Sequence, residues 1–139
     1  MGRDRSFEVM NLYLKDVLTD RKFELLEQIA AEDMRDYSQT IPGRAGLEHH
    51  VRDFWRIFPD VEVKVLRIIA DEDQVVGIWR FSGVAVEEYW GVKPNGTPIA
   101  VTVSSIFRLI DGRVKDYWII YNALDAITQM GAEVRDPQA

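Results

Sequence analysis

The sequence contains no cysteine and only two histidines, and acidic residues outnumber basic ones. Without cysteine the chain has no disulfide framework, thiol nucleophile or thiolate metal site. A total of 17 lysines and arginines against 23 aspartates and glutamates gives a net charge of −6. The basic residues are scattered rather than clustered, which argues against nucleic acid as a partner.

Long hydrophobic runs are also missing. No segment approaches the roughly 20 apolar residues of a membrane-spanning helix, so we expect no membrane association. The charged N-terminus, MGRDRSFEVM, lacks the apolar stretch of a secretory signal, and we expect a cytoplasmic protein. The 139 residues fit one domain, 1–139, whose ends at about 1–5 and 133–139 we expect to be disordered.

Helical periodicity dominates the first half of the chain. Apolar residues recur at helical spacing over Phe7 to about Thr19, Lys22 to Ala31 and Arg44 to Ile57. The third helix is expected to end at Phe58-Pro59-Asp60, because proline disfavours helix in the residue before it. The polar segment from Glu32 to Gln39 is irregular and has room for a short strand.

Strand signals dominate the second half. The predicted strands are 61–70, 74–86, 98–110 and 113–121, followed by a short closing helix. An Asp-Gly pair at 111–112 between two alternating runs indicates a tight hairpin, because both turn residues need positive φ. Helices followed by antiparallel strands predict an α+β fold in two layers, with a cavity between them as the default ligand site.

Alternation assigns faces to the last two strands. One face of the first carries Val101, Val103, Ser105, Phe107 and Leu109. In the second, we place Trp118, Ile120 and Asn122 toward the cavity. The outer face is then expected to carry Thr102, Ser104, Ile106, Tyr117, Ile119 and Tyr121. This half-apolar face is expected to be buried against a second copy in a homodimer.

Several segments resemble the SnoaL-like polyketide cyclases, of the superfamily with the nuclear-transport-factor-2-type cone fold. They are the FPD helix end, the connection GVKPNGTPIAV, the hairpin IFRLIDGRV and the closing segment WIIYNAL, within a match from about Val9 to Gly131. The resemblance implies a curved antiparallel or mixed sheet wrapped around three N-terminal helices, with a central cavity. The scaffold hosts cyclases, isomerases, hydroxylases, epoxide hydrolases and binding modules.

The resemblance also shows which catalytic groups are missing. Asn122 stands where the family's aldol cyclases carry a catalytic carboxylate, and Ser105 stands where they often carry histidine. Tyr13 matches the oxyanion tyrosine of ketosteroid isomerases, whose two carboxylates fall near Ser38 and on Ser105. Tyr37 occupies a position where the family often has histidine. An asparagine can polarise a carbonyl but cannot abstract a proton.

His50 is therefore the candidate proton shuttle. Its spacing from Leu47 and Phe54 puts it on the inward face of the third helix, and histidine changes charge near neutral pH. Two alternatives stay open: a core histidine bonded to a backbone carbonyl, or a rotated helix with His49 inward. The acidic residues Asp33, Asp36 and Asp60 are interpreted as helix-flanking or turn residues.

Aromatic side chains supply most of the expected substrate-binding surface. The candidates are Trp79, Trp118, Phe107, Phe54, Tyr89, Trp90 and Glu88. Adjacent histidines point about 100° apart on a helix and cannot share an ion, and no phosphate-binding glycine loop is present. We therefore expect neither a metal nor a cofactor.

These observations predict a cofactor-independent biosynthetic enzyme. It would bind a polyketide-like or polycyclic oxygenated substrate in an apolar cavity and catalyse cyclisation or isomerisation, with hydroxylation also open. The proposed catalytic groups are Asn122, His50, Tyr13, Tyr37 and Ser105. The alternatives are a non-catalytic ligand-binding or dimerisation module, and a cyclase that folds a polyene without proton abstraction. A closed apolar pocket with convergent polar groups would favour an enzyme.

Overall fold

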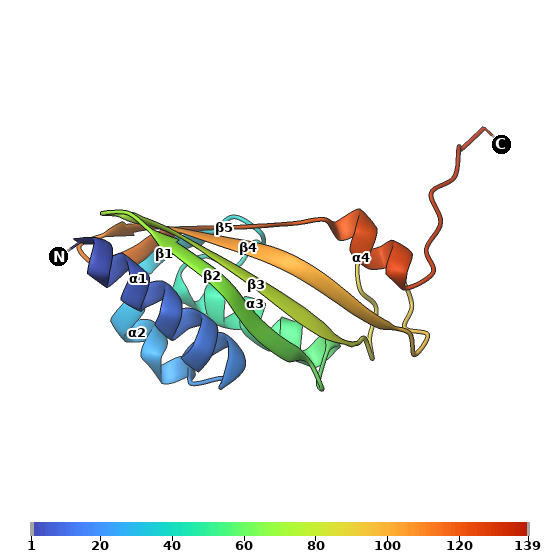
Figure 1. Cartoon of the computed structure of the whole chain (residues 1–139), viewed down its shortest axis with the longest axis horizontal. Coiled ribbons are helices and arrows are strands. Elements are labelled where there is room, and N and C mark those ends of the chain that lie inside the picture. The colour runs from blue at the N-terminus through green and yellow to red at the C-terminus, as the bar shows by residue number, and fades with distance from the viewer. Residues whose placement is uncertain (1, 139) are drawn as a thin grey trace.

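Five strands form one curved sheet in the order β1-β5-β4-β3-β2, as the computed structural model of residues 2–138 shows (Figure 1). The strands are β1 (Ala30–Asp36), β2 (Glu62–Ala70), β3 (Gln74–Val84), β4 (Pro98–Ile110) and β5 (Arg113–Tyr121). β1 runs parallel to β5 and the other neighbours are antiparallel. The predicted α+β fold with a mixed sheet is confirmed.

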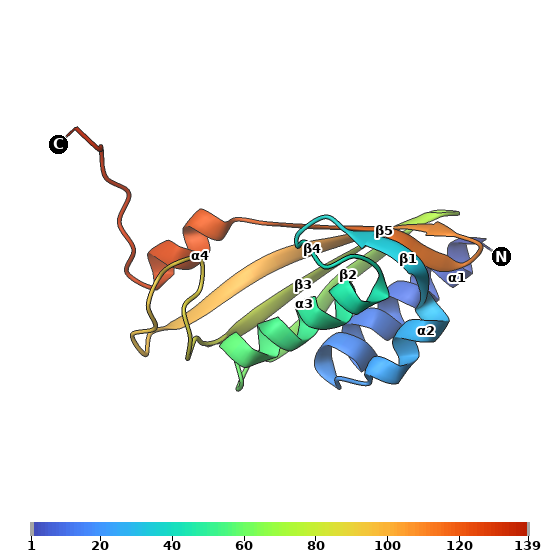
Figure 2. The same cartoon turned by 180° about the vertical axis from the view of Figure 1, so that it is seen from behind.

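Three helices cover one face of this sheet. They are α1 (Gly2–Leu12), α2 (Leu26–Ile29) and α3 (Arg44–Ile57), and no helix of the described residues lies over the opposite face (Figures 1 and 2). A short α4 (Ala123–Gln129) lies at the far end, against β4. None of the helices in residues 2–138 is long and apolar enough to cross a membrane.

The N-terminal half departs from the predicted boundaries in two places. Helix α1 begins at Gly2 rather than Phe7, and Arg5 within it donates from Nε to the carbonyl oxygen of Gly112 at 2.9 Å. Residues 2–5 are therefore helical, not disordered as predicted, while residues 1 and 139 of the predicted disordered ends lie outside the described part. The second predicted helix is only a 3₁₀ turn followed by α2, because the chain enters β1 at Ala30.

Two further features bring the helices close to the sheet. The first helix widens into a π-helix over Tyr13–Thr19, a geometry frequent near functional sites. Gly77 on β3 lets α1 approach, because a Cβ there would lie 2.7 Å from the sulfur of Met10 and 2.8 Å from Leu14. Helix α3 matches its predicted bounds and ends before Phe58-Pro59.

The β4–β5 hairpin contains a bulge that the sequence pattern does not reveal. Its turn is as predicted, with φ of +53° at Asp111 and +76° at Gly112. Leu109 pairs with Val114, but the next residue of β4, Arg108, pairs with Asp116. Lys115 is thus an extra residue, and such a bulge changes which side chains of the bulged strand face the core.

The bulge overturns the predicted faces of β5. Tyr117 pairs with Phe107 and is completely buried on the inner face, followed there by Ile119 and Tyr121. Trp118 and Ile120 take the outer face, with 37% and 61% of their surface exposed. The faces of β4 are as predicted, with alternate residues from Val101 to Leu109 buried.

Candidate functional site

A cavity of about 680 Å³ lies between α3 and the inner face of the sheet. Its walls are mostly apolar and aromatic, and Phe54, Phe58, Phe81 and Ile119 contribute to them. Helix α3 supplies part of the wall because its amphipathic spacing turns one side toward the sheet. Polar groups reach the cavity from α3, from the π-helical segment and from β5.

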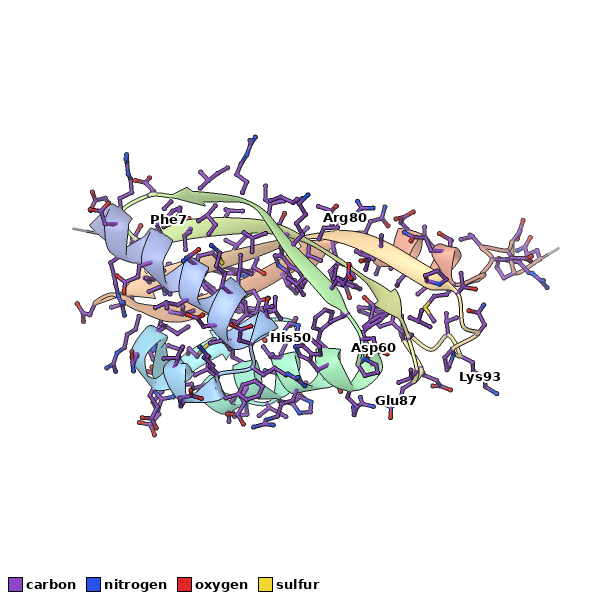
Figure 3. The ribbon with its side chains drawn as sticks, turned by 60° about the horizontal axis from the view of Figure 1, so that its bottom comes forward. Phe7, His50, Asp60, Arg80, Glu87 and Lys93 are labelled. Atoms are coloured by element: carbon purple, nitrogen blue, oxygen red, sulfur yellow. The ribbon has the colours of Figure 1, made fainter. Side chains whose placement is uncertain are left out.

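The central polar group is His50 on α3, which Figure 3 shows in the space between the helices and the sheet. Its Nδ1 lies 2.8 Å from Oδ2 of Asp36, the last residue of β1. The Asp36 side chain is fully buried, whereas 24% of the His50 side chain is exposed. The imidazole also stacks on the ring of Tyr117, with centroids 5.7 Å apart. His49 is exposed, so His50 is the inward histidine of the pair.

The Asp36 contact determines which nitrogen of His50 can act as a base. An ionised carboxylate only accepts hydrogen bonds, so Nδ1 must carry a proton and donate it to Asp36. In the neutral imidazole the lone pair is then on Nε2, which makes no hydrogen bond to a residue in the described range. This arrangement suits Nε2 to take a proton from a ligand.

Ser38 completes the Asp36 side of this cluster and is not a nucleophile. Its hydroxyl donates to Oδ1 of Asp36 at 2.6 Å, and its backbone N–H donates to the same oxygen at 2.9 Å. The Ser38 oxygen lies 3.2 Å from Nδ1 of His50, the nitrogen already bound to Asp36. A catalytic triad needs serine and aspartate on opposite ring nitrogens, which is not the case here.

The hydrogen bonds around Asp36 keep it ionised. Burial by itself would raise the pKa of this carboxyl. Three effects lower the pKa: the hydrogen bond from His50, the charge of His50 and the two hydrogen bonds from Ser38. Together they outweigh burial, so the pKa of Asp36 is lowered. An ionised Asp36 would stabilise a positive charge on His50 after proton uptake.

Two tyrosines, a serine and a tryptophan form the polar floor of the cavity. Trp79 Nε1 donates to the hydroxyl oxygen of Ser105 at 3.0 Å, and that oxygen lies 3.2 Å from the hydroxyl of Tyr117. The ring of Tyr13 packs edge-on against that of Tyr117, with centroids 5.8 Å apart. All four residues are at most 3% exposed.

Burial raises the pKa of both phenols strongly. Desolvation is the largest cause for each, and the nearby negative charge of Asp36 adds to it. Tyr13 and Tyr117 therefore stay protonated at neutral pH and can donate hydrogen bonds.

The cavity mouth is formed by a tight turn between β3 and β4. Trp90 and Gly91 adopt positive φ, +51° and +77°, and Tyr89 and Val92 exchange two backbone hydrogen bonds across them at 3.0 Å. Trp90 Nε1 donates to the Tyr121 hydroxyl at 2.6 Å. This bond ties the turn to the end of β5 and places an indole ring at the rim.

Charged side chains lie at the same rim. Arg56 on α3 forms ion pairs with Asp53 on the same helix and with Glu87 in the turn connection (Figure 3 labels Glu87). These pairs join α3 to the segment that carries Trp90. Glu88 also lines the cavity and is exposed.

Three predicted site residues lie outside the cavity. Asn122 caps α4, where its Oδ1 accepts the Asp125 N–H at 2.9 Å. Tyr37 is 47% exposed, donates to Asp116 at 3.0 Å and stacks on Trp118, with centroids 5.1 Å apart. Asn122 and Trp118 were misplaced because the bulge at Lys115 reverses the faces of β5. Tyr37 was misplaced because β1 ends at Asp36, before it.

The remaining predicted residues lie in or directly behind the cavity. Those that line it are Tyr13, His50, Phe54, Trp79, Glu88, Tyr89 and Trp90. Ser105 lies behind the Tyr117 hydroxyl, and Phe107 is core, in edge contact with the rings of Tyr13 and Tyr117.

Sequence reasoning missed Asp36 and Tyr117. For Asp36 a signal existed, since Met34 and Asp36 alternate as buried positions of β1, a strand that the polar composition concealed. For Tyr117 no sequence signal marks the bulge. Across residues 2–138 no cluster of three or more potential metal-binding side chains occurs.

Comparison with known proteins identifies the family of the chain. A sequence model described as SnoaL-like polyketide cyclase matches residues 8–130. TsrD from Streptomyces laurentii has a TM-score of 0.84 at 20% identity, over 96% of this chain and 99% of its own. A SnoaL-like polyketide cyclase from Agrobacterium tumefaciens has a TM-score of 0.77 at 14% identity, over 89% of this chain and 96% of its own. An LEH-like epoxide hydrolase from M. tuberculosis has a TM-score of 0.68 at 16% identity, over 94% of this chain and 92% of its own. No protein of curated function matches the sequence.

Proposed function

The chain belongs to the SnoaL-like polyketide cyclase family, and on that premise we propose that it is an acid–base enzyme with His50 and Asp36 as its proton-transfer pair. The substrate would be a polyketide-like or polycyclic oxygenated compound, and the reaction a cyclisation or isomerisation. No cofactor enters the proposal. Relatives of this fold carry different activities, so the site and not the fold must support the reaction.

The observation that carries this proposal is the His50–Asp36 pair inside an apolar cavity. A carboxylate that holds Nδ1–H leaves Nε2 as a base and stabilises the imidazolium that forms. His50 Nε2 would take the proton from the carbon next to a carbonyl, whose electrons move onto the carbonyl oxygen as an enolate. Return of the proton from His50 to another carbon gives an isomer. Attack of the enolate carbon on a second carbonyl closes a ring, and the new alkoxide takes the proton back from His50.

Proton exchange tests the proposal without knowledge of the natural substrate. The bicyclic ketone beta-tetralone, incubated with the protein in heavy water, is expected to exchange its α-protons faster than in buffer. His50→Gln should lower the protein-dependent rate by about a hundredfold to ten-thousandfold, since general-base catalysis contributes on that scale. Proton NMR measures the loss of the α-proton signal.

His49→Gln is the matched control, because it makes the same change on a second histidine at the cavity that has no carboxylate partner among the described residues. It is expected to exchange at the wild-type rate. Equal rates in wild type and His50→Gln would refute the proposed role of His50. Binding of the ketone with no exchange above buffer would favour the ligand-binding module instead.

We also propose that the chain forms a homodimer through the outer face of its sheet. The support is apolar surface on that face: Trp118 and Ile120 of β5 are exposed there, and Tyr37 stacks on Trp118. Contiguous exposed apolar patches mark protein interfaces, whereas single exposed apolar residues are common on any surface.

A further inference from the structure

Trp79 fixes the direction of the hydrogen bonds among the polar residues at the cavity floor. An indole can donate a hydrogen bond from Nε1 but has no acceptor, so Ser105 must be the acceptor in the 3.0 Å contact between them. The hydroxyl hydrogen of Ser105 then needs another partner, because Ser105 is fully buried. The Tyr117 hydroxyl oxygen, 3.2 Å away, is in place to accept it.

Tyr13 packs beside Tyr117, with 5.8 Å between their ring centroids. The Tyr117 oxygen accepts the hydroxyl hydrogen of Ser105. Its own hydrogen finds no acceptor among residues 2–138, and Tyr117 lines the cavity.

We propose that the hydroxyl of Tyr117 is an oxyanion-binding group, the end of a one-way donor chain that runs from Trp79 through Ser105. The proposal rests on the proposed function, and it adds where the carbonyl oxygen of the substrate binds. The ligand class is compounds with an enolate or phenolate oxygen on a flat ring system.

Two geometric features support this role. A phenol oxygen that accepts a hydrogen bond is a better donor through its own hydrogen, because successive hydrogen bonds polarise one another. The Tyr117 ring also stacks against the imidazole of His50, with 20° between the planes, so base and donor are adjacent in the same cavity. The carbonyl oxygen and the neighbouring carbon of a substrate need such adjacent partners. Tyr13, Ser105 and Trp79 are positioning residues in this arrangement.

Para-nitrophenol and para-nitroanisole are the probes. They have nearly the same shape, but only the first ionises, and above its own pKa it is a phenolate without any help from His50. Wild type is expected to bind the phenolate more tightly than the anisole, measured by calorimetry. The negative charge of Asp36 opposes the phenolate equally in wild type and variants, so it cancels in the comparison.

Tyr117→Phe is expected to reduce the phenolate-to-anisole affinity ratio about tenfold to a hundredfold, the worth of a hydrogen bond to a charged group. Ser105→Ala should reduce it by a smaller factor and Ser105→Thr, which keeps the hydroxyl, should restore it. Tyr37→Phe, the same change on the outer face, should leave the ratio unchanged. A purely structural role would weaken both probes together and leave the ratio constant.

A ratio unchanged in Tyr117→Phe, or no preference for the phenolate in wild type, overturns the proposal. If Tyr117→Phe does not fold, an unchanged ratio in Ser105→Ala overturns it and a reduced ratio upholds it. The role of His50 is tested separately, below the pKa of para-nitrophenol. There the yellow phenolate should form on binding to wild type and to Tyr37→Phe but not to His50→Gln.

Discussion

Asp36 holds the Nδ1 proton of His50 while its own carboxyl is shielded from solvent. This single contact turns an inward-facing histidine into an oriented base. The spacing of Leu47, His50 and Phe54 predicted that His50 faces inward, since α3 is a regular helix with unambiguous periodicity. Alternation within β1 could have marked Asp36 as an inward residue, but not its pairing with His50, because contacts between elements leave no trace in local spacing.

The pH dependence of stability tests the state of Asp36. Its folded-state pKa is lowered, so the ionised form stabilises the fold at neutral pH, and this contribution is lost as pH falls below about 4 toward the folded-state pKa. Asp36→Asn should therefore cost on the order of 1–3 kcal/mol at pH 7 and less in acid. Urea unfolding at a series of pH values measures the difference.

Asp33→Asn is the comparison variant on the same strand. Its carboxyl is 76% exposed, where it pairs with Lys115, and an exposed pair contributes little to stability. We expect a smaller loss than for Asp36→Asn at pH 7. A penalty for Asp36→Asn that stays constant from neutral pH to acid would show that Asp36 does not stabilise the fold through its charge.

At the scale of elements, helices and strands were predicted well where one face is buried and regular. The bounds of α3, β4 and β5 agree with the pattern, and the Asp111–Gly112 turn forms as expected. The failures share a cause, which is irregular backbone. The π-helical turn after α1, the early start of β1 and the bulge at Lys115 leave no mark in the apolar periodicity of the sequence.

The contact of α1 with β3 gives a prediction at this scale. Gly77→Ala would place a methyl group 2.7 Å from the Met10 sulfur and 2.8 Å from Leu14. Overpacking of this kind costs about 1–3 kcal/mol, which urea unfolding would register. Gly83→Ala on the same strand, whose nearest neighbour would be at 3.3 Å, should cost less. The reverse order would mean that α1 moves freely over β3.

For the whole molecule, the uncovered face of the sheet leads to a prediction about assembly. Ile120→Arg puts a charge on the proposed dimer interface and should convert dimers to monomers, as measured by light scattering after size-exclusion chromatography. Val134→Arg, on an exposed apolar residue beyond α4, should leave the dimer intact. A wild-type protein that elutes as a monomer at all concentrations would contradict the proposed homodimer.

Lys115 is the extra residue of the β5 bulge, and its presence determines which side chains of β5 face the cavity. Counted from the hairpin turn, β5 holds two interleaved sets of side chains, one with Tyr117 and one with Trp118, and the extra residue determines which set meets the ligand. Loss of one codon at this point would exchange the two sets without altering another residue. New ligand chemistry on this scaffold is therefore within reach of a single deletion, and alignments that carry active-site roles across such a deletion will assign them to the wrong side of the sheet.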